Sequence, residues 1–161
     1  MSYLIDGHNL IPHVRGLSLN MVEDETLLIE ILKVFCRERR THVDCFFDNA
    51  QLGLSSTQRY GRLTVYFMPS GRTADDGILN KLRKLKRDAR NWIVVSSDQS
   101  VQGGAREVHA QVISAEAFSK LLDEMFRKTE TFEKQEEIEL TQDEVNEWLQ
   151  LFKKRSRKDR K

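Results

Sequence analysis

The sequence predicts an α/β protein in which a mostly parallel central sheet is flanked by helices. Short apolar runs typical of strands alternate along the chain with longer segments of helical periodicity. Parallel strands need crossover connections, which helices supply with right-handed geometry. The chain has 161 residues, of which 39% are hydrophobic, so it can form one domain with a sizeable core and an appendage.

The predicted strands and helices follow one another without a low-complexity linker. "SYLI" is the first strand, and residues 21–40 form a helix with acids at its start and arginines at its end. "HVDCFF" is a short buried strand, and Pro69 stops the β-rich run "RLTVYFM". A second helix begins near Thr73, "NWIVVSS" and "AQVIS" are further strands, and "AEAFSKLLDEMFRK" is another helix.

Composition excludes several classes of protein. Cys36 and Cys45 fit neither a disulfide framework nor the spacing of a zinc site, which indicates free thiols in a reducing compartment. No apolar run is long enough to cross a bilayer, and the start of the chain lacks the basic and apolar regions of a signal peptide. We therefore expect a cytoplasmic protein with no membrane partner.

Acidic residues stand at four strand ends. Asp6 follows the first strand, Asp48 the second and Asp98 the strand "NWIVVSS", while Asp75 and Asp76 open the helix after "RLTVYFM". The carboxyl ends of parallel strands share one edge of a sheet, so these acids should converge there. Converging carboxylates repel one another unless a cation neutralises them, and Mg²⁺ or Mn²⁺ prefers such oxygen ligands. Since such a cluster can activate water and stabilise a leaving oxygen, the pattern predicts a metal-dependent nuclease.

Each acid also has a structural interpretation. Thr73 and Asp76 have the spacing of a capping box, and Asp98 can cap a helix that begins at "QSVQ". Asp48 and the quartet "DGHN" are equally typical of turns. The two interpretations are compatible, because one aspartate of a pair can cap a helix while its neighbour faces the metal. The recurrence of an acid at four separate strand ends favours a site.

Four segments carry a resemblance to a known family. "YLIDGHNLI", "FFDNA", "TADDGILNKL" and "VVSSDQSVQ", in this order over about the first 125 residues, resemble the NYN branch of the PIN-like nucleases, and most of all the YacP-like group. The resemblance implies a PIN-like, Rossmannoid three-layer fold that uses a divalent metal to cut RNA. The catalytic and metal-binding residues that it implies are Asp6, Asp75, Asp76 and Asp98, with support from Asn9 and Asp48.

The first motif departs from the family at one position. His8 stands where an aromatic residue such as tyrosine is more usual, and we interpret it as a neighbour of the site and not as a ligand. In this interpretation Gly7 lets the backbone turn away so that Asp6 can present its carboxylate, and Asn9 fastens the loop.

The helix that begins at the predicted site is strongly basic. The segment "NKLRKLKRDAR" has almost no compensating acid, so it should attract a phosphate backbone, although many charge runs are only solvated faces. Arg72, just before the acidic pair, is suited to bidentate phosphate binding. The RNA-binding residues that we predict are Arg72, Lys81, Arg83, Lys84 and Arg87.

The C-terminal part differs from the rest in charge. We expect a nuclease domain over residues 1–128 and a charged extension over residues 129–161. Within the extension, residues 141–154 have the pattern of an amphipathic helix with a capping box, and a basic tail follows. This helix either packs on the domain or docks to a partner such as a ribosome or another ribonucleoprotein, and the tail should add RNA affinity.

The leading hypothesis is a metal-dependent ribonuclease of endonucleolytic action that hydrolyses RNA phosphodiester bonds. The alternative is a catalytically weak RNA- or ribosome-binding adaptor that retains the nuclease fold. A third class comprises other α/β phosphotransfer modules. These are disfavoured, because "DGHN" lacks the D-x-D of haloacid-dehalogenase-like phosphatases and neither the acidic pair nor the late lysine of a receiver is evident.

Overall fold

The computed structural model describes residues 1–14, 17, 22–48, 56–133 and 150. The strands in this part of the chain are β1 (Ser2–Asp6), β2 (Val43–Phe47), β3 (Ser56–Tyr60), β4 (Leu63–Phe67), β5 (Trp92–Val95) and β6 (Gln111–Ile113). The helices are α1 (Gly7–Leu10), η1 (Ile11–His13), α2 (Val22–Arg39), α3 (Ala74–Leu85), η3 (Lys86–Asn91), α4 (Gln99–Glu107) and α5 (Ala115–Glu133).

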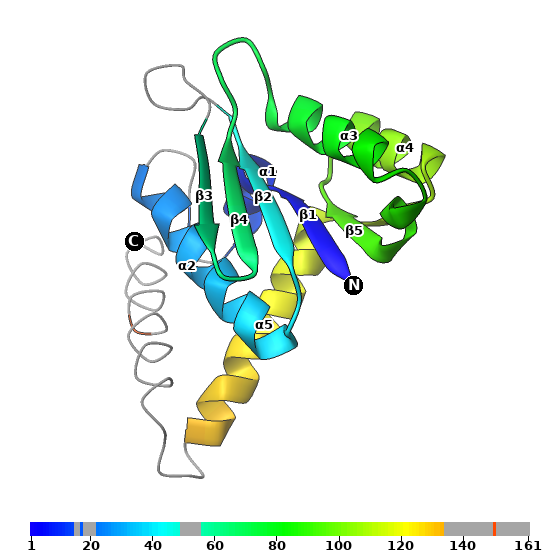
Figure 1. The fold of residues 1–161 in the computed structure, drawn as a ribbon. Helices are drawn as coiled ribbons and strands as arrows, with labels where there is room; N and C mark the ends of the chain where they lie inside the picture. Colours follow the sequence, from blue (N-terminus) through cyan, green and yellow to red (C-terminus); the bar gives the residue numbers. More distant parts are fainter. Residues whose placement is uncertain (15–16, 18–21, 49–55, 134–149, 151–161) are drawn as a thin grey trace.

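The six strands form one sheet in the order β3-β4-β2-β1-β5-β6 (Figure 1). Every neighbouring pair is parallel except β3 and β4, which form an antiparallel hairpin at one edge. The predicted α/β fold with a mostly parallel sheet is therefore confirmed. Since β1, β2, β4 and β5 run in the same direction, the segments that follow them leave from the same edge of the sheet.

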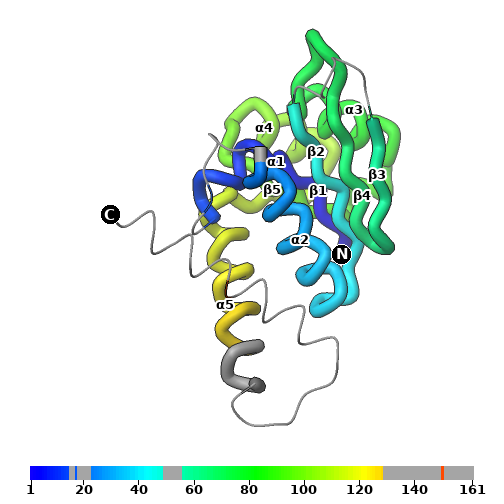
Figure 2. Tube along the Cα trace, turned by 90° about the vertical axis from the view of Figure 1, so that its left-hand side faces the viewer, coloured from blue at the N-terminus to red at the C-terminus, as the bar shows by residue number. Residues whose placement is uncertain are grey.

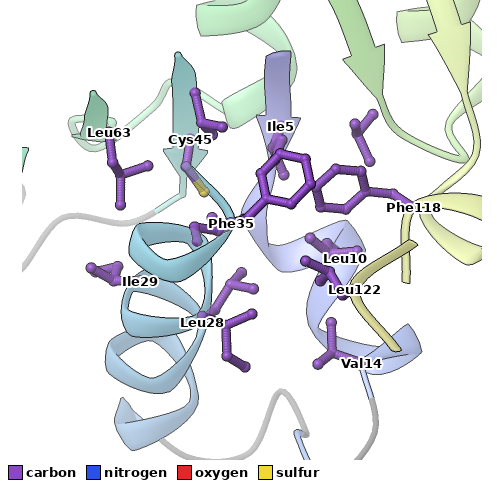
Figure 3. Packing of buried hydrophobic residues seen from close by; sticks show 14 of the residues in the cluster. Ile5, Leu10, Val14, Leu28, Ile29, Phe35, Cys45, Leu63, Phe118 and Leu122 are labelled. Atoms are coloured by element: carbon purple, nitrogen blue, oxygen red, sulfur yellow. The ribbon is translucent and has the colours of Figure 1, made fainter. Parts of the chain in front are cut away.

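Helices cover both faces of this sheet and make three layers. The larger core lies between α1, α2 and α5 and one face, and the smaller core lies between α3 and α4 and the other face. Figure 2 shows α2 and α5 on the opposite side of the strands from α3. In the larger core the rings of Phe35 and Phe118 meet edge to face at 5.0 Å (Figure 3), and Tyr3 packs on both rings.

Helix α2 agrees with the predicted helix over residues 21–40. Its first turn carries Glu23 and Glu25, which favour the positive end of the helix dipole. The helix ends at Arg39, and the next residue, Arg40, has a left-handed φ of 49° that lets the Thr41 amide donate to the Cys36 carbonyl at 3.2 Å.

The structure contains elements that the sequence interpretation lacked. Residues 7–10, predicted as a turn, are the single-turn helix α1. The edge strand β3 was not predicted, because four of its five residues are exposed and its composition is polar. Residues 99–107 form helix α4, which begins at "QSVQ", the stretch that Asp98 was expected to cap.

Helix α5 continues to Glu133, past residue 128, where we had placed the end of the nuclease domain. The predicted amphipathic helix and basic tail lie outside the described residues, apart from Gln150. The division into domain and extension therefore stays a prediction. No helix in the described part of the chain is long and apolar enough to span a membrane.

Candidate functional site

The site begins with Asp6, the last residue of β1. Its side chain is only 7% exposed and caps α1, because Oδ1 accepts a hydrogen bond from the Asn9 amide at 3.3 Å. The strand thus delivers the carboxylate to the edge of the sheet, and the short helix fixes its orientation.

The carboxyl groups of Asp6 and Asp75 are hydrogen-bonded to each other. Burial, followed by this bond, raises the pKa of Asp6 to about 7. The pKa of Asp75 is also raised, mainly by burial, with smaller effects from the charges of Asp98, Asp48 and Asp76. Two carboxyl groups in such contact must share a proton or bind a cation. Residues 69 positions apart in sequence therefore meet in one acidic pair.

Asp75 and Asp76 have different contacts at the start of α3. The predicted capping box is present: Thr73 Oγ1 accepts from the Asp76 amide at 3.2 Å, and the Thr73 amide donates to Asp76 Oδ2 at 3.1 Å. Asp76 is exposed, and its carboxylate accepts the hydrogen bond that caps α3, while Asp75 contacts Asp6. The structure thus pairs only the first of these two acids with Asp6.

Asp48 and Asp98 lie at the periphery of this pair, and both bind helix starts. Asp48 Oδ1 accepts from the Ala74 amide at the beginning of α3. Asp98 Oδ1 accepts from the amides of Ser100 and Val101 at 2.8 and 3.1 Å, so it is the N-cap of α4. Both charges nevertheless raise the pKa of Asp75, which places them near the acidic pair.

Asn9 joins the ends of β1 and β5. Its Oδ1 accepts a hydrogen bond from the Ser97 amide at 2.9 Å, across 88 positions of sequence. Asn9 therefore does fasten a loop, but the loop is the one that carries Asp98.

We predicted that Gly7 is needed for the conformation of the backbone, and this reason is wrong. Gly7 has no positive φ, unlike Gly61 and Gly71, so the backbone does not need glycine for its conformation. Space is the reason, because a Cβ on Gly7 would overlap the buried ring of Phe47.

His8 and Glu25 make a contact that the sequence interpretation missed. His8 Nε2 lies 2.8 Å from Glu25 Oε1 in α2, and this bond raises the pKa of His8 against the opposing effect of burial. On its other side, Nδ1 lies 3.8 Å from Asp48 Oδ2. His8 thus connects α2 to the periphery of the site, which no local pattern indicated, since Glu25 is 17 positions away.

Most of the predicted RNA-binding residues are exposed. Arg83, Lys84 and Arg87 stand on α3 and η3, and Arg72 stands in the loop before α3. Lys81 differs, because its Nζ lies 3.4 Å from the buried Asp44 Oδ2 and 5.6 Å from the centre of the Trp92 ring. Its charge therefore already has a partner on the sheet.

Comparison with known proteins decides the family. The family model of the YacP-like NYN domain matches residues 3–158 of this chain. The chain belongs to the YacP-like NYN domain family. The matched range includes most of the C-terminal extension. Members of the NYN family are typically nucleases, and NYN nucleases generally use divalent metals.

Solved structures agree with this assignment at the level of the fold. The crystal structure of Rae1 (YacP) from Bacillus subtilis matches with a TM-score of 0.69 and 22% identity over 83% of this chain and 80% of that chain. The crystal structure of its W164L mutant matches with a TM-score of 0.64 and 22% identity over 90% of each chain. A comparison with curated proteins found no match to this chain.

The acidic pair fits a hard divalent cation by its chemistry. Asp6 and Asp75 offer carboxylate oxygens, and a cation would offset the burial and the nearby charges that together raise the pKa of Asp6. Within the described residues of this NYN domain, no group of three or more His, Cys, Asp or Glu side chains is arranged to hold a metal ion. Because Mg²⁺ usually keeps several waters and needs only one or two carboxylates, a pair is a sufficient donor set.

Proposed function

We propose that this NYN domain is a metal-dependent endoribonuclease that hydrolyses RNA phosphodiester bonds at the carboxyl edge of its sheet. The observation that carries the proposal is the direct contact between the carboxyl groups of Asp6 and Asp75. Two adjacent carboxylates, one of them buried, are costly to the fold, and such perturbed pairs are typical of functional sites. The membership in a family of typical nucleases supports the same assignment.

Each residue of the site has a distinct role in this proposal. Asp6 and Asp75 would hold Mg²⁺ or Mn²⁺, which when bound supplies a Lewis acid for the activation of water and for the charge on the phosphate. Asp48 and Asp98 fix the starts of α3 and α4 and add negative potential around the pair. Asn9 holds the loop of Asp98 against the end of β1.

The basic residues of α3 and η3 would bind the substrate backbone. Arg83, Lys84 and Arg87 are exposed on the segment whose start carries Asp75. Phosphate contacts of this kind add affinity that falls with salt, and they position RNA without reading its sequence. We place the protein in the cytoplasm, where the buried free thiols Cys36 and Cys45 would remain reduced.

A cleavage assay tests this proposal. Purified protein is incubated with single-stranded, structured and circular RNA in Mn²⁺, Mg²⁺ or EDTA, beside an Asp6→Asn variant. We expect wild-type protein to open circular RNA only with metal, and the variant to be inactive with an unchanged fold. Cleavage that persists in EDTA or in the variant would contradict the proposed chemistry.

One observation favours a second candidate, a catalytically weak RNA- or ribosome-binding adaptor. Asp48 and Asp98 bind backbone amides, and the described residues contain no cluster of three metal ligands. An adaptor would bind RNA or ribosomes equally well with and without divalent metal and would tolerate Asp6→Asn. In the nuclease proposal, a ribosome or other ribonucleoprotein remains a predicted partner of the extension over residues 129–161.

A further inference from the structure

The helices that the structure describes cover only part of the face of the sheet that carries Asp6. Helix α3 packs over β1 and β2 on this face. Figure 1 shows no described helix in front of β3 and β4, which continue the sheet beyond α3. The part of this face that the described helices leave uncovered therefore begins beside the candidate site.

Strand register places a row of side chains across this face at the level of Asp6. Asp6 on β1 is paired with Phe46 on β2, Phe46 with Tyr66 on β4, and Tyr66 with Thr57 on β3. Side chains at paired positions point to the same face of a sheet. With a strand spacing of about 4.8 Å, Tyr66 stands about 10 Å from Asp6 along the row.

The rings of Phe46 and Tyr66 are stacked, with centroids 4.7 Å apart and planes inclined by 13°. Phe46 is buried against α3, because a Cβ on Gly77 would approach its ring to 2.7 Å. Tyr66 is the outer ring and is only partly buried. One of its faces lies on Phe46, and the other is directed toward β3, where the register partner is the short, exposed Thr57.

The segment that carries Tyr66 is basic in composition. Residues 56–74 contain three arginines and no acidic residue. Arg59 is exposed and shares the face of Thr57, because strand side chains alternate with a period of two. Asp44 lies on the same face, but it is paired with Lys81. A polyanion can therefore lie along β3 and β4 without meeting an uncompensated carboxylate of this hairpin.

We propose that Phe46, Tyr66, Thr57 and Arg59 form a stacking site, here called the Tyr66 site, for one base of single-stranded RNA that is bound beside the catalytic carboxylates. The proposal rests on the proposed function, because it makes the bound strand the substrate. A base on the free face of Tyr66 extends the existing stack by one ring, and Arg59 contacts the backbone. A duplex hides its base faces, so the Tyr66 site selects single strands.

Binding measurements test the Tyr66 site separately from cleavage. Fluorescence anisotropy is recorded with a short labelled single-stranded RNA of mixed sequence, in EDTA and on an Asp6→Asn background, so that no substrate is consumed. Tyr66→Phe keeps the ring, Tyr66→Leu keeps apolar packing on Phe46 without a stacking face, and circular dichroism verifies each fold. We expect wild-type affinity for Tyr66→Phe and a loss of about tenfold for Tyr66→Leu, within the range for one base–aromatic stack.

Two neighbouring residues on β3 provide a matched control. Arg59→Gln should weaken binding and reduce the salt slope by about 1, because one phosphate contact is lost. Gln58→Ala changes an exposed side chain on the opposite face and should bind as wild type. Equal weakening by both substitutions would overturn the assignment of this face.

The outcomes separate this inference from the proposed function. Unchanged RNA affinity in a folded Tyr66→Leu variant, or equal binding of duplex and single strand, would overturn the Tyr66 site even if the wild type cleaves RNA. The expected binding pattern in a protein that never cleaves RNA would sustain the Tyr66 site and overturn the nuclease proposal. Where cleavage occurs, Tyr66→Leu should raise KM about tenfold and leave kcat nearly unchanged.

Discussion

Replacement of Asp6 by asparagine should stabilise the folded protein at neutral pH when divalent metal is absent. Burial and the hydrogen bond with Asp75 raise the pKa of Asp6 from 3.8 to about 7. The folded state thus holds a proton that the unfolded chain releases near pH 4, so this contribution to stability is lost as pH rises from 3.8 to about 7. At about 1.36 kcal/mol per pH unit, ionisation of Asp6 in the fold costs on the order of 4 kcal/mol.

Urea unfolding in EDTA at about pH 4.5 and pH 7.5 measures this cost. The difference in free energy of unfolding between Asp6→Asn and wild type should grow by about 3 kcal/mol between these pH values, because Asp6 ionises only in the wild type. Asparagine retains an oxygen that can accept from the Asn9 amide, so the cap of α1 is kept. Glu124→Gln, which removes an exposed carboxylate from α5, is the matched control and should follow the wild type.

Divalent metal should make the wild type more stable than the Asp6→Asn variant. Mn²⁺ or Mg²⁺ binds the ionised pair and should raise the stability of wild type near pH 7.5, with little effect on Asp6→Asn. An Asp6→Asn protein that is less stable than wild type in EDTA near pH 7.5 would refute the reasoning. In that case the carboxylate would be a structural cap and not half of a repelling pair.

Three further predictions concern substitutions outside the acidic pair. Gly7→Ala should destabilise the protein by about 1 to 3 kcal/mol, because the added methyl overlaps a buried ring, whereas Gly103→Ala in α4, which meets no atom within 4 Å, should be neutral or stabilising in urea unfolding. Arg40→Gly should raise the free energy of unfolding by about 1 kcal/mol, because glycine adopts a left-handed φ without strain, and a lower melting temperature would contradict this. Lys84→Glu with Arg87→Glu should reduce the salt slope of RNA binding by about 2, and an unchanged slope would show a solvated face.

The sequence predicted the fold well where apolar patterns reach the core. The buried strands β1, β2 and β5 are short apolar runs, and α2 has an apolar stripe that packs on the sheet. Strand β3 escaped prediction because its sequence, "STQRY", carries no apolar alternation and its pairing with β4 is set by the hairpin. Exposed edge strands give little signal in composition.

The candidate site was predicted in part for a similar reason. The positions of Asp6 and Asp98 at strand ends predicted them as site residues, and the local spacing of Thr73 and Asp76 predicted the capping box. Which acid of "ADD" meets Asp6 depends on the rotation of α3 over the sheet, which only tertiary packing fixes. The ion pair of Lys81 with Asp44 likewise joins α3 to β2, and neither segment's sequence predicts that these two elements pack together.

The most direct test of the central claim compares two adjacent carboxylates. Single-turnover cleavage of labelled single-stranded RNA in Mn²⁺ is measured for Asp75→Asn and Asp76→Asn. Asp75→Asn should lose activity by about a hundredfold or more, on the scale of one lost transition-state contact, since it breaks the pair with Asp6. Asp76→Asn should retain most of its activity and lose only some stability from the capping box of α3. Equal losses in both variants, or full activity in Asp75→Asn, would contradict the assignment of Asp6 and Asp75 as the catalytic pair.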